Sequence, residues 1–101
     1  MNKLAYSFND VLIVPQYSDI QSREECDTSV KLPNFSMDIP VFAANMDTIC
    51  GVKMAQEMVE LGGHGIIHRY MKVTETHNII SDWNYSAYGT LIVSVGSLAN
   101  D

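Results

Sequence analysis

The sequence lacks several patterns that mark common classes of protein. No apolar run approaches the roughly 18 residues of a membrane-spanning helix, and residues 1–10 contain no apolar core of a secretory signal. We therefore expect no membrane segment and a cytoplasmic location. The sequence also has no GxGxxG or P-loop motif for phosphate and no GxSxG nucleophile motif.

Basic residues and cysteines are both scarce. The chain has 6 Lys and Arg against 12 Asp and Glu, giving a net charge of −6, which argues against a nucleic-acid-binding surface. The negative charge does not argue against a nucleotide ligand, because backbone amides and one or two cations can hold a phosphate. Cys26 and Cys50 have neither CxxC nor metal-ligand spacing. We expect no metal site, and we expect both thiols to be small buried hydrophobic groups.

Two kinds of segment follow one another along the chain. Residues 1–40 read as an irregular lead-in, with one short strand expected at residues 28–32. From residue 41 onward, short apolar runs alternate with helical periodicity. The pattern predicts strands at residues 41–44, 65–68 and 90–95, and helices at residues 51–61 and 74–83.

The two predicted helices are amphipathic. We expect Asp47 or Thr48 to cap the first of them, because both side chains can accept hydrogen bonds from free helical amides. We expect the second to turn Thr76, Ile79, Ile80 and Trp83 inward.

The order strand, helix, strand, helix, strand predicts an α/β fold with a parallel sheet. Both the doubly wound sheet and the (β/α)8 barrel use this unit, and periodicity does not choose between them. A complete barrel takes about 250 residues, and the chain has 101. Three parallel strands alone leave an open edge and half a core. We therefore expect either a fragment or a chain that assembles with others.

The functional residues of α/β folds cluster at the carboxyl edge of the sheet. Residues 45–48, 68–71 and 96–101 should lie there side by side. Met46 at this edge either packs against a flat heterocycle or belongs to the core. Arg69 either binds phosphate or carboxylate or pairs with a surface acid.

Three histidines and one acid have a plainer interpretation. Asp47 is either a helix cap or a hydrogen-bond acceptor for a ligand. We interpret His68 as a packed histidine rather than a general base, and we expect His64 and His77 to be exposed.

Five motifs resemble one known family, the IMP dehydrogenase/GMP reductase family. They cover nearly the whole chain in the family's order. The motifs are FNDVLIVP at residues 8–15, SR followed by ECDTSV at residues 22–30, AANMDT at residues 43–48, GGHGIIHR at residues 62–69 and SVG at residues 94–96.

The resemblance implies the amino-terminal part of a (β/α)8 barrel, holding its first three strands and two helices after an irregular lead-in. The interval between residues 69 and 90 is too short for the pair of regulatory CBS modules found in most IMP dehydrogenases. ECDTSV, ANMDT and this short interval favour the GMP reductase branch, which converts GMP and NADPH to IMP, ammonia and NADP. The alternatives are IMP dehydrogenase, which uses IMP, NAD and water, and an inactive truncated barrel.

The resemblance also implies which parts of the enzyme this sequence does not contain. In the family a cysteine after a glycine-rich loop, following the sixth strand, attacks C2 of the purine. Neither Cys26 nor Cys50 lies in such a context, so we expect no catalytic residue here and no activity from this chain alone. The loop for a monovalent cation is likewise outside this sequence.

Two sets of binding residues carry over from the family motifs. The positions that match cofactor contacts are Ser22, Arg23 and Arg69, the first two reaching the NADPH of a neighbouring subunit. The positions that match purine contacts are Asn45, Met46, Asp47 and Ser97. The family also implies a homo-oligomer, a tetramer when the chain is full length.

Overall fold

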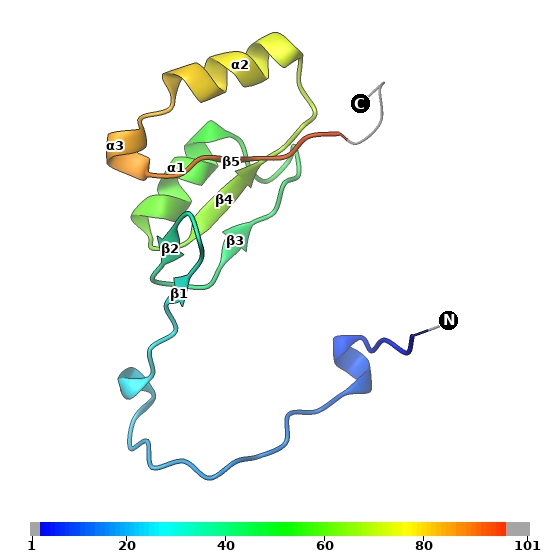
Figure 1. Ribbon diagram of the computed structural model, residues 1–101, viewed down its shortest axis with the longest axis vertical. Coiled ribbons are helices and arrows are strands. Elements are labelled where there is room, and N and C mark those ends of the chain that lie inside the picture. The colour runs from blue at the N-terminus through cyan, green and yellow to red at the C-terminus, as the bar shows by residue number, and fades with distance from the viewer. Residues whose placement is uncertain (1–2, 97–101) are drawn as a thin grey trace.

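The structure, a computed structural model, describes residues 3–96, in which an extended arm precedes a small α/β body (Figure 1). The elements follow one another in this order: η1 (Phe8–Asp10), η2 (Arg23–Glu25), β1 (Val30–Lys31), β2 (Ser36–Met37), β3 (Phe42–Ala43), α1 (Val52–Glu60), β4 (His64–Ile67), α2 (Val73–Asp82), α3 (Tyr85–Tyr88) and β5 (Ile92–Val93). None of these helices is long and apolar enough to cross a bilayer.

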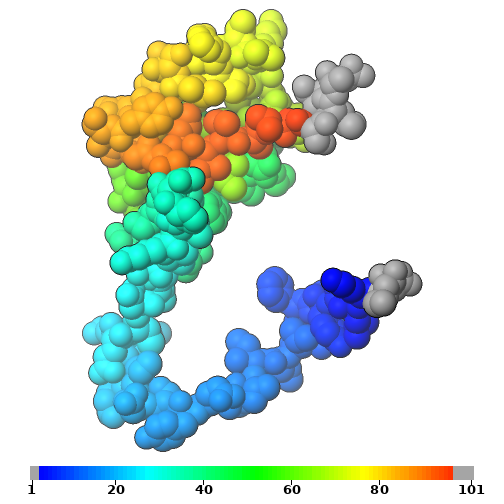
Figure 2. Space-filling model, in the orientation of Figure 1, coloured from blue at the N-terminus to red at the C-terminus, as the bar shows by residue number. Residues whose placement is uncertain are grey.

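The arm, residues 3–29, lies apart from the body (Figure 2). Every side chain in it is exposed, and its hydrogen bonds are local, such as the one from the Ser7 amide to Asp10. The arm explains why the radius of gyration is 17.9 Å, when a compact chain of this length has about 13 Å. The irregular lead-in predicted from the sequence is confirmed.

The central sheet has the strand order β3-β4-β5, and both pairs are parallel. Phe42 lies opposite His64, and Ile66 lies opposite Ile92. The predicted alternation of strands and helices is confirmed, with two differences. The strands β3 and β5 are shorter than the apolar runs suggested, and a short helix, α3, follows α2.

An antiparallel hairpin of β1 and β2 lies at the amino edge of this sheet. Its turn is closed by the Leu32 amide, which donates to the Phe35 carbonyl at 2.8 Å. The Thr90 hydroxyl donates to the Asn34 carbonyl at 3.0 Å, which ties the hairpin to the segment leading into β5. The sequence predicted β1 but missed β2, which is only two residues long.

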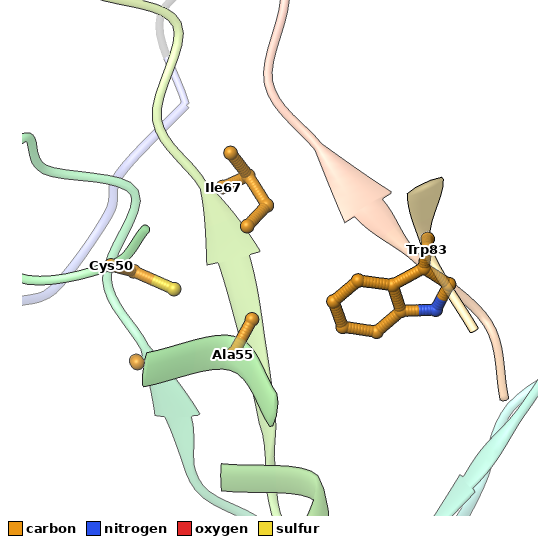
Figure 3. Packing of buried hydrophobic residues seen from close by; sticks show 5 residues of the cluster. Cys50, Ala55, Ile67 and Trp83 are labelled. Atoms are coloured by element: carbon orange, nitrogen blue, oxygen red, sulfur yellow. The ribbon is translucent and has the colours of Figure 1, made fainter. Parts of the chain in front are cut away.

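The core lies between the sheet and α1, where Ala43, Cys50, Ala55, Ile67 and Trp83 are buried together (Figure 3). Helix α1 approaches β4 so closely because β4 has glycine at position 65. A Cβ atom there would lie 2.8 Å from Cys50 Sγ and 2.9 Å from Ala55 Cα. Because Gly65 has no side chain, α1 can pack this close to β4.

Two predictions about the helices are wrong. Neither Asp47 nor Thr48 caps α1, whose N-cap is Gly51 without a side-chain hydrogen bond. The residues before Gly51 form a separate turn, in which the Ile49 amide donates to the Met46 carbonyl at 2.9 Å. On α2, Trp83 and Ile79 pack against the core as expected, but Ile80 is exposed.

Two predictions about exposure are also wrong. Cys26 is exposed, because it lies in the arm, whereas Cys50 is buried as expected. His64 is 3% exposed, because the hairpin covers it and the Phe35 ring lies 4.7 Å from its own ring. His77 is exposed, as predicted.

Candidate functional site

The loop after β3 folds tightly over the carboxyl edge of the sheet. The Met46 carbonyl accepts hydrogen bonds from the amides of Ile49 and Cys50, both at 2.9 Å. The buried Cys50 side chain anchors this turn in the core, and the Cys50 carbonyl accepts from the His68 amide at 3.3 Å. This last bond joins the loop after β3 to the end of β4. The Met46 side chain is left half exposed above the turn.

The loop after β4 holds a small group of stacked side chains. The Tyr70 amide donates to His68 Nδ1 at 3.1 Å, and the two rings are stacked with centroids 6.3 Å apart. The Arg69 guanidinium carbon lies 5.2 Å from the centroid of the Tyr70 ring, within the range of a cation–π interaction. Because His68 Nδ1 accepts a hydrogen bond, His68 has a positioning contact within the loop, in agreement with its interpretation as a packed residue.

The two loops enclose a hollow of about 350 Å³, which we call the base hollow. It is lined by Asn45, Met46, Asp47 and Tyr70. The structure therefore brings together three residues that the sequence singled out for purine binding. The sequence placed Tyr70 at the same edge but gave it no role.

A second hollow of about 380 Å³, the neighbouring hollow, lies between α2 and the end of β5. It is lined by Arg69, Met71, Val73, Thr76, His77, Ile80, Ser94, Val95 and Gly96. Arg69 and Tyr70 are consecutive, yet they line different hollows. The Arg69–Tyr70 pair thus lies where the two hollows adjoin.

Two of the remaining candidate residues, Ser22 and Arg23, are not brought to this edge. Ser22 and Arg23 lie in the arm, where the Ser22 hydroxyl accepts from the Glu24 amide at 3.2 Å and Arg23 begins η2. Ser97 lies outside the described residues. A third hollow, of about 390 Å³, lies at the opposite edge of the sheet, beside the hairpin and the buried His64.

Two further observations concern the reactivity of the buried Cys50 thiol and the grouping of metal-binding side chains. Burial raises the pKa of the Cys50 thiol, which disfavours the thiolate that a nucleophile requires. Among residues 3–96, no three His, Cys, Asp or Glu side chains cluster so as to hold a metal ion.

Comparison with known proteins decides the family. The model of the IMP dehydrogenase / GMP reductase domain matches residues 5–85. The chain belongs to this family. Its sequence is 47% identical over 77 residues to an inosine-5'-monophosphate dehydrogenase of Nitrosopumilus maritimus, covering 75% of this chain and 16% of that protein. It is 43% identical over 70 residues to a GMP reductase of Leishmania donovani, covering 68% of this chain and 14% of that protein.

Solved structures of the same family share the α/β fold of this chain. The inosine 5' monophosphate dehydrogenase of Legionella pneumophila matches with a TM-score of 0.74 and 35% identity, covering 96% of this chain and 29% of that one. GMP reductase from Trypanosoma brucei, in complex with guanosine 5'-triphosphate, matches with a TM-score of 0.61 and 46% identity, covering 66% and 16%. The chain thus spans between 14% and 29% of the length of these relatives.

Proposed function

We propose that this chain contributes a nucleotide-binding edge to a GMP reductase-type oxidoreductase, which converts GMP and NADPH to IMP, ammonia and NADP. The observation that carries the proposal is the base hollow, where Asn45, Met46 and Asp47 lie together at the carboxyl edge of a parallel sheet. Ligands of open α/β sheets and barrels bind at this edge.

The chemistry of the base hollow suits a purine. The Met46 thioether is polarisable and packs well against a flat heterocycle. The Asn45 amide and the Asp47 carboxylate offer acceptors for ring N–H and amino groups, and the amide also offers donors. The volume of about 350 Å³ is at the lower end of the usual range for small-molecule sites. The hollow can therefore take a base with part of its ribose.

The neighbouring hollow suits the cofactor. Arg69 supplies a permanent positive charge there, and guanidinium groups bind phosphate well. In the proposed enzyme, Ser22 and Arg23 reach the NADPH of an adjoining subunit in a homotetramer. The arm supports this assignment, because every side chain of residues 3–29 is exposed and the arm lies apart from the body (Figure 2). Ser97 would add a polar contact to the purine.

The partly exposed face of the sheet opposite α1 supports the place of this chain in a (β/α)8 barrel. Phe42, His64, Ile66 and Ile92 share this face, by strand register and alternation, and the hairpin covers His64. Phe42 is 42% exposed there, and Ile66 and Ile92 are half-buried. The interior of a barrel would cover this face, and the chain would form its first three strands and two main helices. Only α2 and α3 lie between β4 and β5, which supports a barrel without CBS modules at this point.

IMP dehydrogenase is the second candidate, with NAD in place of NADPH. It is favoured by the 47% identity to the dehydrogenase of Nitrosopumilus maritimus and by the TM-score of 0.74 to that of Legionella pneumophila. ECDTSV and ANMDT, at residues 25–30 and 44–48, favour the reductase. The reading frame that follows Asp101 in its gene discriminates between them. A frame with a mobile flap carrying an Arg-Tyr pair, which activates water in the dehydrogenase, would refute the reductase.

The chain alone should not turn over substrate, because its two cysteines lack the glycine-rich context of the family nucleophile. The test is the absorbance of NADPH in the presence of GMP and the purified 101-residue chain. We expect no protein-dependent loss of NADPH, while equilibrium binding of GMP is retained. Sustained oxidation of NADPH would show that a residue within this chain is catalytic.

A further inference from the structure

Tyr70 stands out among the residues of the base hollow, because neither the family motifs nor the charge pattern assigns it a function. Among residues 3–96 it is the only aromatic residue lining that hollow, beside Asn45, Met46 and Asp47. Its ring is 64% exposed, so it contributes little to the core. An aromatic ring left open to a ligand hollow is a surface for stacking.

The Tyr70 side chain has two neighbours within its own loop. Its ring lies nearly parallel to that of His68, at an interplanar angle of 20° with centroids 6.3 Å apart, and the Arg69 guanidinium carbon lies 5.2 Å from its centroid. The Tyr70 backbone amide donates to His68 Nδ1, which orders the backbone of the loop. A ring with such neighbours loses less conformational entropy when a base stacks on it than a freely rotating side chain would.

Two walls of the base hollow therefore suit a planar ligand. Met46 comes from the loop after β3, and Tyr70 comes from the loop after β4. The loops are tied together by the hydrogen bond from the His68 amide to the Cys50 carbonyl. This backbone hydrogen bond links the two loops that carry Met46 and Tyr70.

We propose that Tyr70 is the stacking residue that selects a flat aromatic base in this hollow. The inference rests on the proposed nucleotide-binding function and deepens it, because it names the side chain that recognises the base rather than the sugar or phosphate. The phenol hydroxyl is dispensable for stacking, whereas the ring is not. Arg69 polarises the ring and holds it, so Arg69 is a positioning residue for Tyr70.

The test compares dissociation constants of the full chain for GMP and for ribose 5-phosphate, which lacks the base. We expect Tyr70→Ala to weaken GMP binding on the order of ten-fold, in line with the loss of one base–aromatic stack, and to leave ribose 5-phosphate binding within about two-fold. Tyr70→Phe should bind GMP as the unmodified chain does, and Tyr70→Leu should resemble Tyr70→Ala. Tyr17→Ala, in the exposed arm, is the matched control and should change nothing.

Each of the other outcomes would overturn either the role of Tyr70 or the proposed function. Unchanged GMP binding by Tyr70→Ala would overturn the role of Tyr70 and leave the proposed function standing. Equal weakening of GMP and ribose 5-phosphate would show that Tyr70 supports the sugar-phosphate and would also overturn it. A failure of the unmodified chain to bind GMP at all would overturn the proposed function and this inference together. Tyr70 is largely exposed, so these variants should keep the fold, which circular dichroism checks.

Discussion

The packing of α1 on β4 should be very sensitive to a single methyl group at Gly65. In Gly65→Ala the new Cβ would lie 2.8 Å from Cys50 Sγ, 2.9 Å from Ala55 Cα and 3.2 Å from Ala55 Cβ. The first contact is to a fully buried side chain and the second to helix backbone, so neither can move away cheaply. The helix must shift outward, and the core around Ile67 must loosen with it.

The magnitude follows from two opposing effects. Overpacking of a core by one methyl group costs about 1–3 kcal/mol, while replacing Gly by Ala restricts the unfolded chain and returns about 0.4–1 kcal/mol. We therefore expect Gly65→Ala to lower the free energy of unfolding by roughly 1–2 kcal/mol. With a urea dependence of ~1–3 kcal/mol/M, the unfolding midpoint should fall by about 1 M.

The assay is urea unfolding followed by the fluorescence of Trp83, the single tryptophan, which is buried in the same core. Gly51→Ala is the matched control, because a Cβ at Gly51 meets nothing within 4 Å. Its cost should stay below ~1 kcal/mol, from the weaker N-cap alone. A midpoint for Gly65→Ala at or above that of the unmodified chain would refute the close approach of helix and sheet.

Three further predictions concern single side chains. Cys26 is exposed, and Cys50 is buried with a raised thiol pKa. A thiol reagent such as DTNB should therefore modify Cys26 quickly and Cys50 only on unfolding. Cys26→Ser should remove the fast phase, and two fast thiols would contradict the burial of Cys50. Trp83→Phe removes the hydrogen bond from the indole N–H to a backbone carbonyl, at 2.9 Å, and should cost about 1–2 kcal/mol in thermal melts followed by circular dichroism; an unchanged melting temperature would contradict this. Hydrogen bonds from the Ser29 hydroxyl and amide lower the pKa of Asp27, so this contact stabilises the local turn at residues 27–29 above the ordinary aspartate pKa, and that stabilisation is lost as pH falls through the lowered value. Ser29→Ala should raise the pKa of Asp27 in an NMR titration, and an unchanged value would contradict the hydrogen bond.

The alternation of strands and helices was predictable because apolar runs and helical periodicity are local signals. The sequence placed α1 within one residue at each end, since Gly51 and Gly62 bound a strongly amphipathic segment. The strand β2 was not predictable in the same way. It is two residues long, and its pairing depends on the turn that joins Leu32 to Phe35.

The wrong predictions have both long-range and local causes. His64 is buried because the hairpin residue Phe35 covers it, and no pattern around His64 reports that contact. Cys26 is exposed because it lies in the arm, which stands apart from the body within the described residues 3–96 (Figure 2). Asp47 does not cap α1, because the amides that follow it close a separate turn on the Met46 carbonyl.

The candidate site was predictable in part for a topological reason. The carboxyl ends of parallel strands meet at one edge, so Asn45, Met46 and Asp47 could be expected near the end of β4. The presence of Tyr70 in the same hollow as Met46 could not, since it depends on the conformation of the loop after β4. The roles of Ser22, Arg23 and Ser97 stay predictions that rest on the family motifs.

The central claim is that nucleotide binds at the carboxyl edge of the sheet. The most direct measurement is a titration of the isotopically labelled chain with GMP, followed through its backbone amide NMR signals. The account predicts shifts at residues 45–47 and 68–70, which line or adjoin the base hollow, and none at residues 34–38, which adjoin the hollow at the opposite edge. Shifts confined to residues 34–38, or no shift at saturating GMP, would contradict it.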